Sequence, residues 1–294
     1  MSTQKLNTLF NTDLDTEQKT LKAAQEGKAY AIEQIIKDHQ NFIYNIALKM
    51  MAHNQDAEDA TQEILLKVIT NLGTFKGKSK LSTWIYRIVV NHVLNVKKSK
   101  SEKVVTTFSA YGDDLDSAPE FDIADDEAWP EKNILVEEAK LSCMTGMLLC
   151  LTREQRIVFV LGEIFVITDR VGSEVLNISR DGFRQKLARV RRQLYDFMNN
   201  KCGLINKNNP CRCSKKTAAF IKIGFVDPMN LQFQSSYIHK IQDKVGTDPT
   251  PLKKQIEYGY QVLYRDHPYK LPPNYSKIVQ NLIESDAFKS TFDF

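Results

Sequence analysis

The chain has 294 residues, 42% of them hydrophobic and 26% charged, and a net charge of +4. This composition excludes a disordered or fibrous protein, and the length predicts two or three domains. No apolar run approaches the ~20 residues that cross a membrane, and the first fifteen residues lack the charged start and apolar core of a signal peptide. We therefore expect a cytoplasmic protein without membrane insertion, whose five cysteines do not form a disulfide framework.

The first helical pattern covers residues 16–51. It predicts one helix, or two helices that separate near Gly27, after a loose N-terminal tail. Its apolar residues, which recur at helical spacing, are Leu21, Ala24, Ala31, Ile35, Ile36, Phe42, Ile43, Ile46 and Ala47.

Residues 56–72 predict an acidic helix with two faces. The apolar face is Ala57, Ala60, Ile64, Val68, Ile69 and Leu72. The second face, at i, i+3, i+4 and i+7, is Asp59, Gln62, Glu63 and Leu66. A solvated surface is the simpler interpretation of that face, but the leucine within it indicates a surface for a partner.

A basic loop and a second helix follow. Eight lysines and arginines against one acid lie between Thr74 and Lys103, with Phe75, Trp84 and Tyr86 among them. Ser82 is a favourable residue to cap the helix. Its expected core face is Ile85, Ile88, Val89, Val93 and Val96, and its expected polar stripe is Thr83, Arg87, Asn91, Asn95 and Lys98. Cations neutralise phosphates and aromatic rings stack on unpaired bases, which suits DNA that is being opened. A basic surface helix with core aromatics is the alternative.

The run D-A-E-D-A-T-Q-E, the loop F-K-G-K-S-K and the run S-T-W-I-Y-R-I-V-V-N resemble region 2 of the sigma-70 family of RNA polymerase sigma factors, extracytoplasmic-function (ECF) type. Asn95 and Lys98 depart from that family's usual acid and arginine. The resemblance implies that Asp59, Gln62, Glu63 and Leu66 bind core RNA polymerase. It also implies that this stretch binds and melts the −10 element of promoter DNA, with contacts from Lys76, Lys78, Lys80, Trp84, Tyr86, Arg87, Asn91, Lys97 and Lys98.

The amino-acid composition changes at residues 104–133. From Val104 to Glu131 there are nine acids, no lysine or arginine, and no apolar periodicity. We expect a flexible acidic linker. In the family that it resembles, such a linker lies in the path of the RNA.

A second helical module is predicted over residues 134–200. Thr152 with Gln155 forms a capping box and predicts a helix start. A short helix over 168–176, a turn at Asn177-Ile178 and a helix capped by Ser179 make a helix-turn-helix. In the last helix, Phe183, Leu187, Val190 and Leu194 face the core.

The cations of that last helix suit duplex DNA. We expect Arg180, Arg184 and Gln185 to read base edges, and Lys186, Arg189, Arg191 and Arg192 to lie on the DNA surface, the last three on phosphates. A solvated basic helix is the alternative. The segments 151–161 and 177–194 resemble region 4 of the same sigma factors, with Gly172 and Gly182 as departures. The fold class expected is mainly α: two small helical modules, 15–103 and 134–200, joined by the linker, with an extension from 201 to 294.

The extension goes beyond the two-module plan. Cys202, Cys211 and Cys213 could ligate zinc with a fourth ligand such as His239, but the spacing is unusual, and incidental or redox-active thiols are the alternative. We therefore predict no metal site and no cofactor. Helices are expected over 236–244, 251–264 and 275–284. Five tyrosines, Tyr258, Tyr260, Tyr264, Tyr269 and Tyr275, indicate an interaction surface, with packing in an ordinary core as the alternative.

Enzyme motifs are absent from the sequence: it holds no phosphate-binding glycine loop, zinc-protease motif or nucleophile elbow. We therefore expect no enzyme but a sigma factor, with core polymerase and promoter DNA as partners. An anti-sigma factor as a third partner is left open. Two alternatives are a stand-alone helix-turn-helix regulator and a helical adaptor that does not bind DNA.

Overall fold

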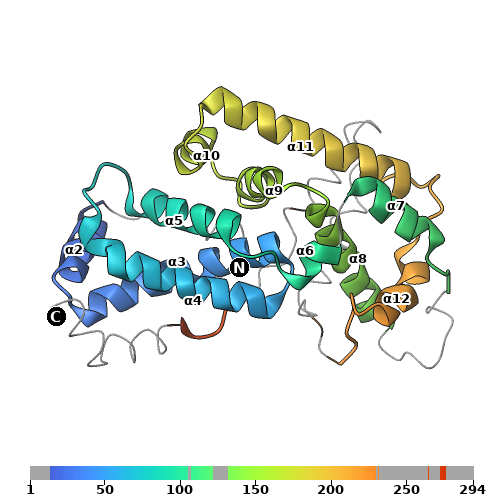
Figure 1. Cartoon of the computed structure of the whole chain (residues 1–294), viewed down its shortest axis with the longest axis horizontal. Helices are drawn as coiled ribbons and strands as arrows, with labels where there is room; N and C mark the ends of the chain where they lie inside the picture. Colours follow the sequence, from blue (N-terminus) through green and yellow to red (C-terminus); the bar gives the residue numbers. More distant parts are fainter. Residues whose placement is uncertain are drawn as a thin grey trace. The chain divides into compact units, whose positions relative to one another are not determined.

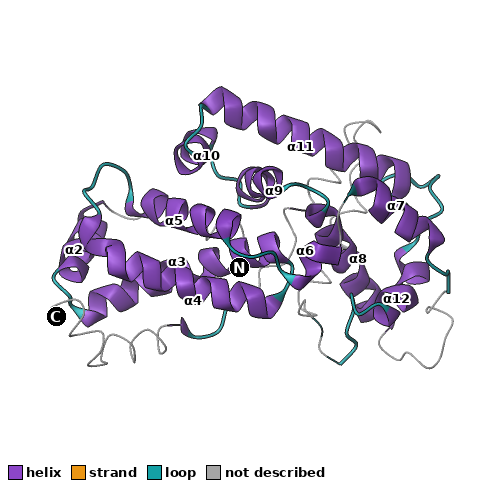
Figure 2. Cartoon of the chain, viewed as in Figure 1, coloured by secondary structure: helices purple, strands orange, loops and turns teal. Residues whose placement is uncertain are grey.

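The computed structural model describes residues 14–104, 107–121, 132–229, 231, 264 and 272–275. These residues form helices joined by short loops and contain no β-strand, which confirms the mainly α class (Figures 1 and 2). They divide into two compact units. Unit 1 takes its described residues from 1–99, 167–183 and 271–294, and unit 2 from 100–166 and 184–270.

Unit 1 is built mainly from four helices near the N-terminus. They are α2 (Leu14–Gln25), α3 (Ala29–Met51), α4 (Asn54–Asn71) and α5 (Leu81–Asn95), with a 3-10 turn, η1 (Leu72–Thr74), after α4. Gly27 separates α2 from α3 with φ 77°, a conformation that glycine adopts without strain. The predicted pattern therefore forms two helices. The short helix α10 (Asp169–Leu176) also belongs to this unit.

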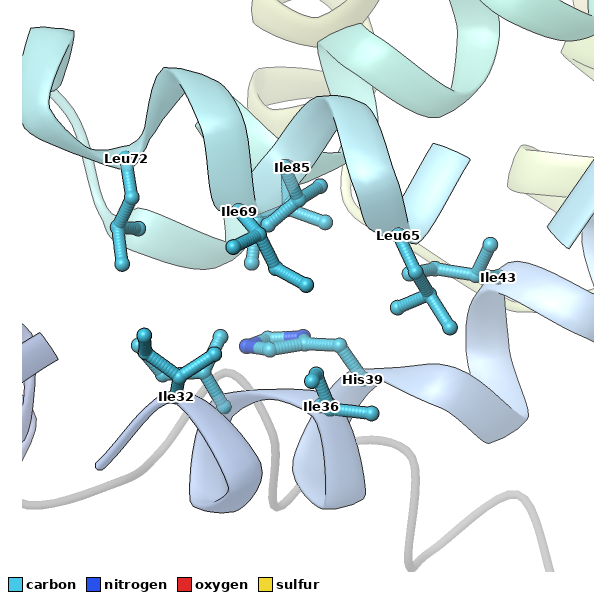
Figure 3. A pocket seen from close by; sticks show the side chains of 10 residues that line it. Ile32, Ile36, His39, Ile43, Leu65, Ile69, Leu72 and Ile85 are labelled. Atoms are coloured by element: carbon cyan, nitrogen blue, oxygen red, sulfur yellow. The ribbon is translucent and has the colours of Figure 1, made fainter. Parts of the chain in front are cut away.

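The core of unit 1 lies where α3, α4 and α5 pack together. The apolar faces predicted for α3 and α4 are buried there, including Ile36, Phe42, Ile43, Ile64 and Val68. An enclosed apolar cavity of about 10 Å³ remains between α3 and α4, next to His39 (Figure 3). Burial against these aliphatic side chains lowers the pKa of His39 to about 4.

The N-cap of α5 lies two residues earlier than the predicted cap, Ser82. Lys80, in an extended conformation, takes the N-cap position, and Ser82 and Thr83 are buried instead of capping the helix or lying in its polar stripe. At α4, the Nδ1 of His53 caps the helix by accepting a hydrogen bond of 3.3 Å from the backbone nitrogen of Asp56.

Unit 2 is built around α8 (Lys132–Leu149), α9 (Arg153–Phe159) and most of α11 (Arg180–Lys201). The helix α9 starts with the predicted capping box of Thr152 and Gln155 and continues as one π-helical turn, η3 (Val160–Ile164). Shorter helices complete the unit: α6 (Lys100–Val104), α7 (Phe108–Ser117) and α12 (Cys213–Lys222).

A buried ion network joins α6 to α9. The Glu102 carboxylate accepts two hydrogen bonds from Arg153, at 2.9 and 2.7 Å, and one from Arg156, at 2.9 Å. Arg156 also donates to the carbonyls of Leu148, Leu149 and Leu151 at the end of α8. Carbonyls at and just after the end of a helix lack the N–H donors of a following turn, so Arg156 both adds donors to them and neutralises Glu102.

The segment expected as an unstructured linker contains α7. Thr107 caps this helix, and its Oγ1 accepts a hydrogen bond of 3.1 Å from Ala110. The Tyr111 ring packs over Gly146, and its hydroxyl donates to the carbonyl of Cys143 at 3.2 Å. The linker expectation is therefore wrong for residues 108–117, because an aromatic anchor and Leu115, one turn later, give this acidic stretch a buried face.

Residues 202–222 form a loop and α12, which the sequence did not predict. Gly203 is required in the loop, because a Cβ there would lie 2.2 Å from the carbonyl oxygen of Cys211. The three helices expected further along fall almost wholly outside the described residues.

Candidate nucleic-acid interface

The four residues of the second face of α4 are all exposed. Asp59, Gln62 and Glu63 point away from the core, and Leu66 is 36% exposed, which is large for an aliphatic side chain of this helix. Asp59 accepts a hydrogen bond from Gln55 at 3.2 Å on the same surface. We call these four residues the α4 stripe. It has the mixed apolar and acidic character of a surface that a protein partner covers.

A groove of about 580 Å³ lies between α4 and α5. This volume is in the range of pockets that hold small ligands. It is lined by Glu63, Lys67, Asn71, Thr74, Trp84, Ile88, Asn91, His92, Asn95 and Val96. Its walls combine one half-buried indole ring with amide and charged side chains, which are the groups that stack on a base and bond to its edges.

His92 forms part of this groove and is largely buried. The Lys67 Nζ donates to its Nδ1 at 2.8 Å, and Glu63 lies 3.8 Å from its Nε2. Burial lowers the pKa of His92, and the positive charge of Lys67 lowers it further, while Glu63 acts in the opposite direction. A neutral His92 thus holds Lys67 at the groove.

The loop before α5 presents the predicted cations. Lys76, Lys78 and Lys80 are exposed, and Gly77 turns the loop with φ 68°. Phe75 and Trp84 pack together with ring centroids 5.4 Å apart. Both rings are half-buried, so each retains an exposed part beside the lysines.

Tyr86 and Arg87 lie differently from the prediction. Tyr86 is fully buried and stacks on Phe42 with ring centroids 4.1 Å apart, so its ring is part of the core and has no free face for a base. The Arg87 Nε donates to the carbonyl of Glu174 in α10 at 2.9 Å. The expected DNA contact of Tyr86 is therefore wrong, and Arg87 is held against α10 by its hydrogen bond.

The far end of α5 keeps the predicted polar surface. Asn91, Asn95, Lys97 and Lys98 are exposed. The Asn95 side chain donates to the carbonyl of Asn91 at 2.7 Å, which occupies its amide nitrogen and leaves its oxygen at the surface. This surface continues the groove and adds two cations to it.

The helix-turn-helix has the geometry that the sequence predicts. Thr168 caps α10, and Asn177 makes the turn in the left-handed conformation, with φ 53°. The Ser179 Oγ accepts a hydrogen bond of 3.0 Å from Gly182 and caps α11. The structure also explains why position 172 is a glycine, because a Cβ there would lie 2.5 Å from the Phe183 ring.

The residues of α11 that were predicted to bind DNA fall into two groups. Arg180, Arg184, Gln185, Lys186, Arg189 and Arg192 are exposed. Arg191 instead forms an ion pair with Glu163, whose side chain is fully buried in η3. Arg191 therefore stabilises unit 2. The sequence pattern did not reveal this role, because Arg191 stands among the other cations of the helix.

The described cysteines are free thiols. Among the residues that the structure describes, no three histidine, cysteine or acidic side chains are arranged to hold a metal ion. Burial raises the pKa of Cys202, Cys211 and Cys213, so these thiols stay protonated at neutral pH. The fourth zinc ligand considered above, His239, lies outside the described residues.

Comparison with known proteins decides the family. A family model described as Sigma-70 region 2 matches residues 35–102, which hold α4, α5 and the groove between them. The ECF RNA polymerase sigma factor SigW of Bacillus subtilis is 26% identical over 184 residues, covering 61% of this chain and 97% of that protein. The chain belongs to the sigma-70 family, ECF type.

Two further relatives agree with this assignment. The sigma factor SigM of Mycobacterium tuberculosis is 25% identical over 175 residues, or 59% of this chain and 80% of that protein. The sigma-E factor of Haemophilus influenzae is 30% identical over 80 residues, which cover 27% of this chain and 42% of that protein. The protein is a sigma factor that acts in transcription initiation.

The structure adds residues to this sigma factor's site that sequence reasoning missed. Lys67 and Asn71 of α4 and His92 of α5 line the groove, although the helical patterns placed none of them in the DNA-binding set. Lys67 is four residues after Glu63, so it could have been found as a continuation of the α4 stripe. None of the described helices has the length and apolarity that crossing a membrane requires.

Proposed function

We propose that this sigma factor binds core RNA polymerase through the α4 stripe. The stripe is exposed, lies in the part that matches region 2, and carries an exposed leucine between carboxylates and an amide. Interfaces combine such an apolar contact with polar contacts around it. The catalysis of RNA synthesis belongs to the polymerase, and we assign the sigma factor no reaction of its own.

We further propose that the groove between α4 and α5 holds an unstacked base of the −10 element. A base that leaves the duplex loses its stacking, at a cost of a few kcal/mol, and an aromatic ring returns about 1–3 kcal/mol per base. Trp84 is the ring that lines the groove, and Asn91 and Asn71 carry amides that bond to base edges. Lys76, Lys78 and Lys80 beside the groove, with Lys97 and Lys98 at the end of α5, neutralise the phosphates of the separated strand. The groove is the observation that carries this proposal.

The −35 element is assigned to α11. Its exposed N-terminal residues Arg180, Arg184 and Gln185 suit guanine and adenine in the major groove. Lys186, Arg189 and Arg192 suit the phosphates on either side. A stand-alone regulator would use α11 alone and would leave the α4 stripe and the groove without a role.

Promoter opening tests the proposal. Holoenzyme with Lys78→Ala and Trp84→Ala should bind promoter duplex but open it poorly, as measured by permanganate reactivity of promoter thymines. A pre-melted template should restore activity, because the unstacking has then been done. Lys103→Ala, an exposed cation outside the groove, is the matched control. Wild-type opening by the double variant would refute the role of the groove.

A further inference from the structure

The C-terminal extension returns to unit 1 at residues 272–275. In Figure 1 this segment, drawn in red, approaches the start of α4. The described residues there are Pro272, Pro273, Asn274 and Tyr275, and the Tyr275 ring is fully buried. Because Tyr275 is 217 residues from Glu58 of α4 along the sequence, this contact is a tertiary one that the extension makes.

Three groups of α3 and α4 surround the Tyr275 hydroxyl. It donates to the carbonyl of Glu58 at 3.4 Å, and the buried Thr61 of α4 lies close to it. Tyr44 of α3, also fully buried, lies close to it. Burial raises the pKa of Tyr275, and the nearby Glu58 and Tyr44 raise it further. The phenol therefore remains neutral, as a buried hydrogen-bond donor must.

This contact lies at the edge of the α4 stripe. Glu58 is one residue before Asp59 and one helical turn before Gln62, so its carbonyl points along the helix toward the stripe. The carboxylate of Asp59 is close enough to act on the Tyr275 hydroxyl. Pro273 and Asn274 are exposed next to the buried tyrosine.

We propose that the segment Pro272–Tyr275 is an intramolecular ligand of the α3–α4 surface that competes with core RNA polymerase for the α4 stripe. The inference rests on the proposed function of that stripe. Tyr275 is the anchor, because it is the buried residue of the segment and the one that donates a hydrogen bond to α4. Polymerase then binds the molecules in which this segment has left α4, and the observed affinity falls with the fraction that remains covered.

The full-length Tyr275→Ala variant tests the competition. It should bind core polymerase about three- to tenfold more tightly than wild type, the range expected if between about two thirds and nine tenths of free molecules hold the contact. Tyr30→Ala is the matched control, because Tyr30 is a 67% exposed tyrosine of α3 and should leave the affinity unchanged. Affinity is measured by titrating labelled sigma factor with core polymerase, and circular dichroism checks the fold.

A second measurement covers the case in which Tyr275→Ala does not fold. The wild-type chain carrying 3-fluorotyrosine, with the signal of position 275 assigned by Tyr275→Phe, should show a buried ¹⁹F resonance that becomes exposed when core polymerase is added. A resonance that stays buried in the complex, or equal affinities of wild type and Tyr275→Ala, would overturn the competition. If no chain, wild type included, binds core polymerase, the proposed function of the α4 stripe fails instead.

Discussion

His39 makes the stability of unit 1 sensitive to acid. It lies between α3 and α4 beside the small apolar cavity of Figure 3, and its Nδ1 has no hydrogen-bond partner among the described residues. Burial lowers its pKa from 6.5 to about 4. We consider the substitution His39→Leu, which removes the titrating group and keeps an apolar side chain of similar size.

The pKa shift sets both the size and the sign of the effect. Lowering the pKa of His39 from 6.5 to about 4 corresponds to roughly 3 kcal/mol of stability that depends on pH. Because the folded pKa is the lower one, the unfolded chain binds the proton first as the pH falls. The contribution of neutral His39 to the free energy of unfolding is therefore complete above pH 6.5. It is lost progressively as the pH falls to about 4, where the folded chain also takes up the proton. His39→Leu should not lose it.

Urea unfolding at a series of pH values from 7.5 to 4 measures the difference. The free energy of unfolding of wild type should fall about 3 kcal/mol more than that of His39→Leu across this range, with most of the loss below pH 6. Buried Lys49, whose pKa burial lowers to about 7, affects stability mainly above pH 7 and is common to both proteins. Parallel curves for the two proteins below pH 6 would refute the assignment of a neutral, buried His39.

Four further predictions concern charged residues. Asp59→Ala with Glu63→Ala should weaken binding to core polymerase without lowering the melting temperature, because both carboxylates are exposed; unchanged co-purification with core would remove the α4 stripe as the docking surface. Arg184→Ala should relax preference at one base pair by about 1–3 kcal/mol, measured by binding to a set of single-substitution promoters. Arg191→Ala should instead lower stability, because it leaves the buried Glu163 without its arginine; equal losses of affinity on every promoter, with unchanged melting, would contradict this division. Glu102→Gln should destabilise unit 2 by about 3–5 kcal/mol, since it leaves Arg153 and Arg156 without their carboxylate; an unchanged melting temperature would show that the network is dispensable.

Local patterns in the sequence predicted the elements whose causes are local. The separation at Gly27, the capping box at Thr152 and the turn at Asn177 depend on residues within one or two turns of the chain, and each is present in the structure. The helix α7 was missed because its anchor, Tyr111, gains its burial from Gly146, which is 35 residues later. Periodicity cannot show a space left by a distant glycine.

The site was predictable in composition but not in detail. The α4 stripe follows from its spacing on a helix with a clear apolar face. The exposed lysines of the loop follow from the cluster of cations around Gly77. Tyr86 was placed wrongly because an aromatic residue between cations fits both a stacking surface and a core. Only the position of Phe42, in a different helix, decides between these two.

The same reasoning separates the arginines of this sigma factor by function. A buried carboxylate is stabilised by a cation beside it, so a buried acid that pairs with arginines identifies arginines that the fold requires. Glu102 identifies Arg153 and Arg156, and Glu163 identifies Arg191. Both acids are far from these arginines in the sequence, so the charge pattern of α11 alone presents Arg191 as one more phosphate contact. Within α11, removing the arginine paired in this way leaves Arg180, Arg184, Arg189 and Arg192, and it is on these four that substitution should change DNA binding while leaving the fold intact.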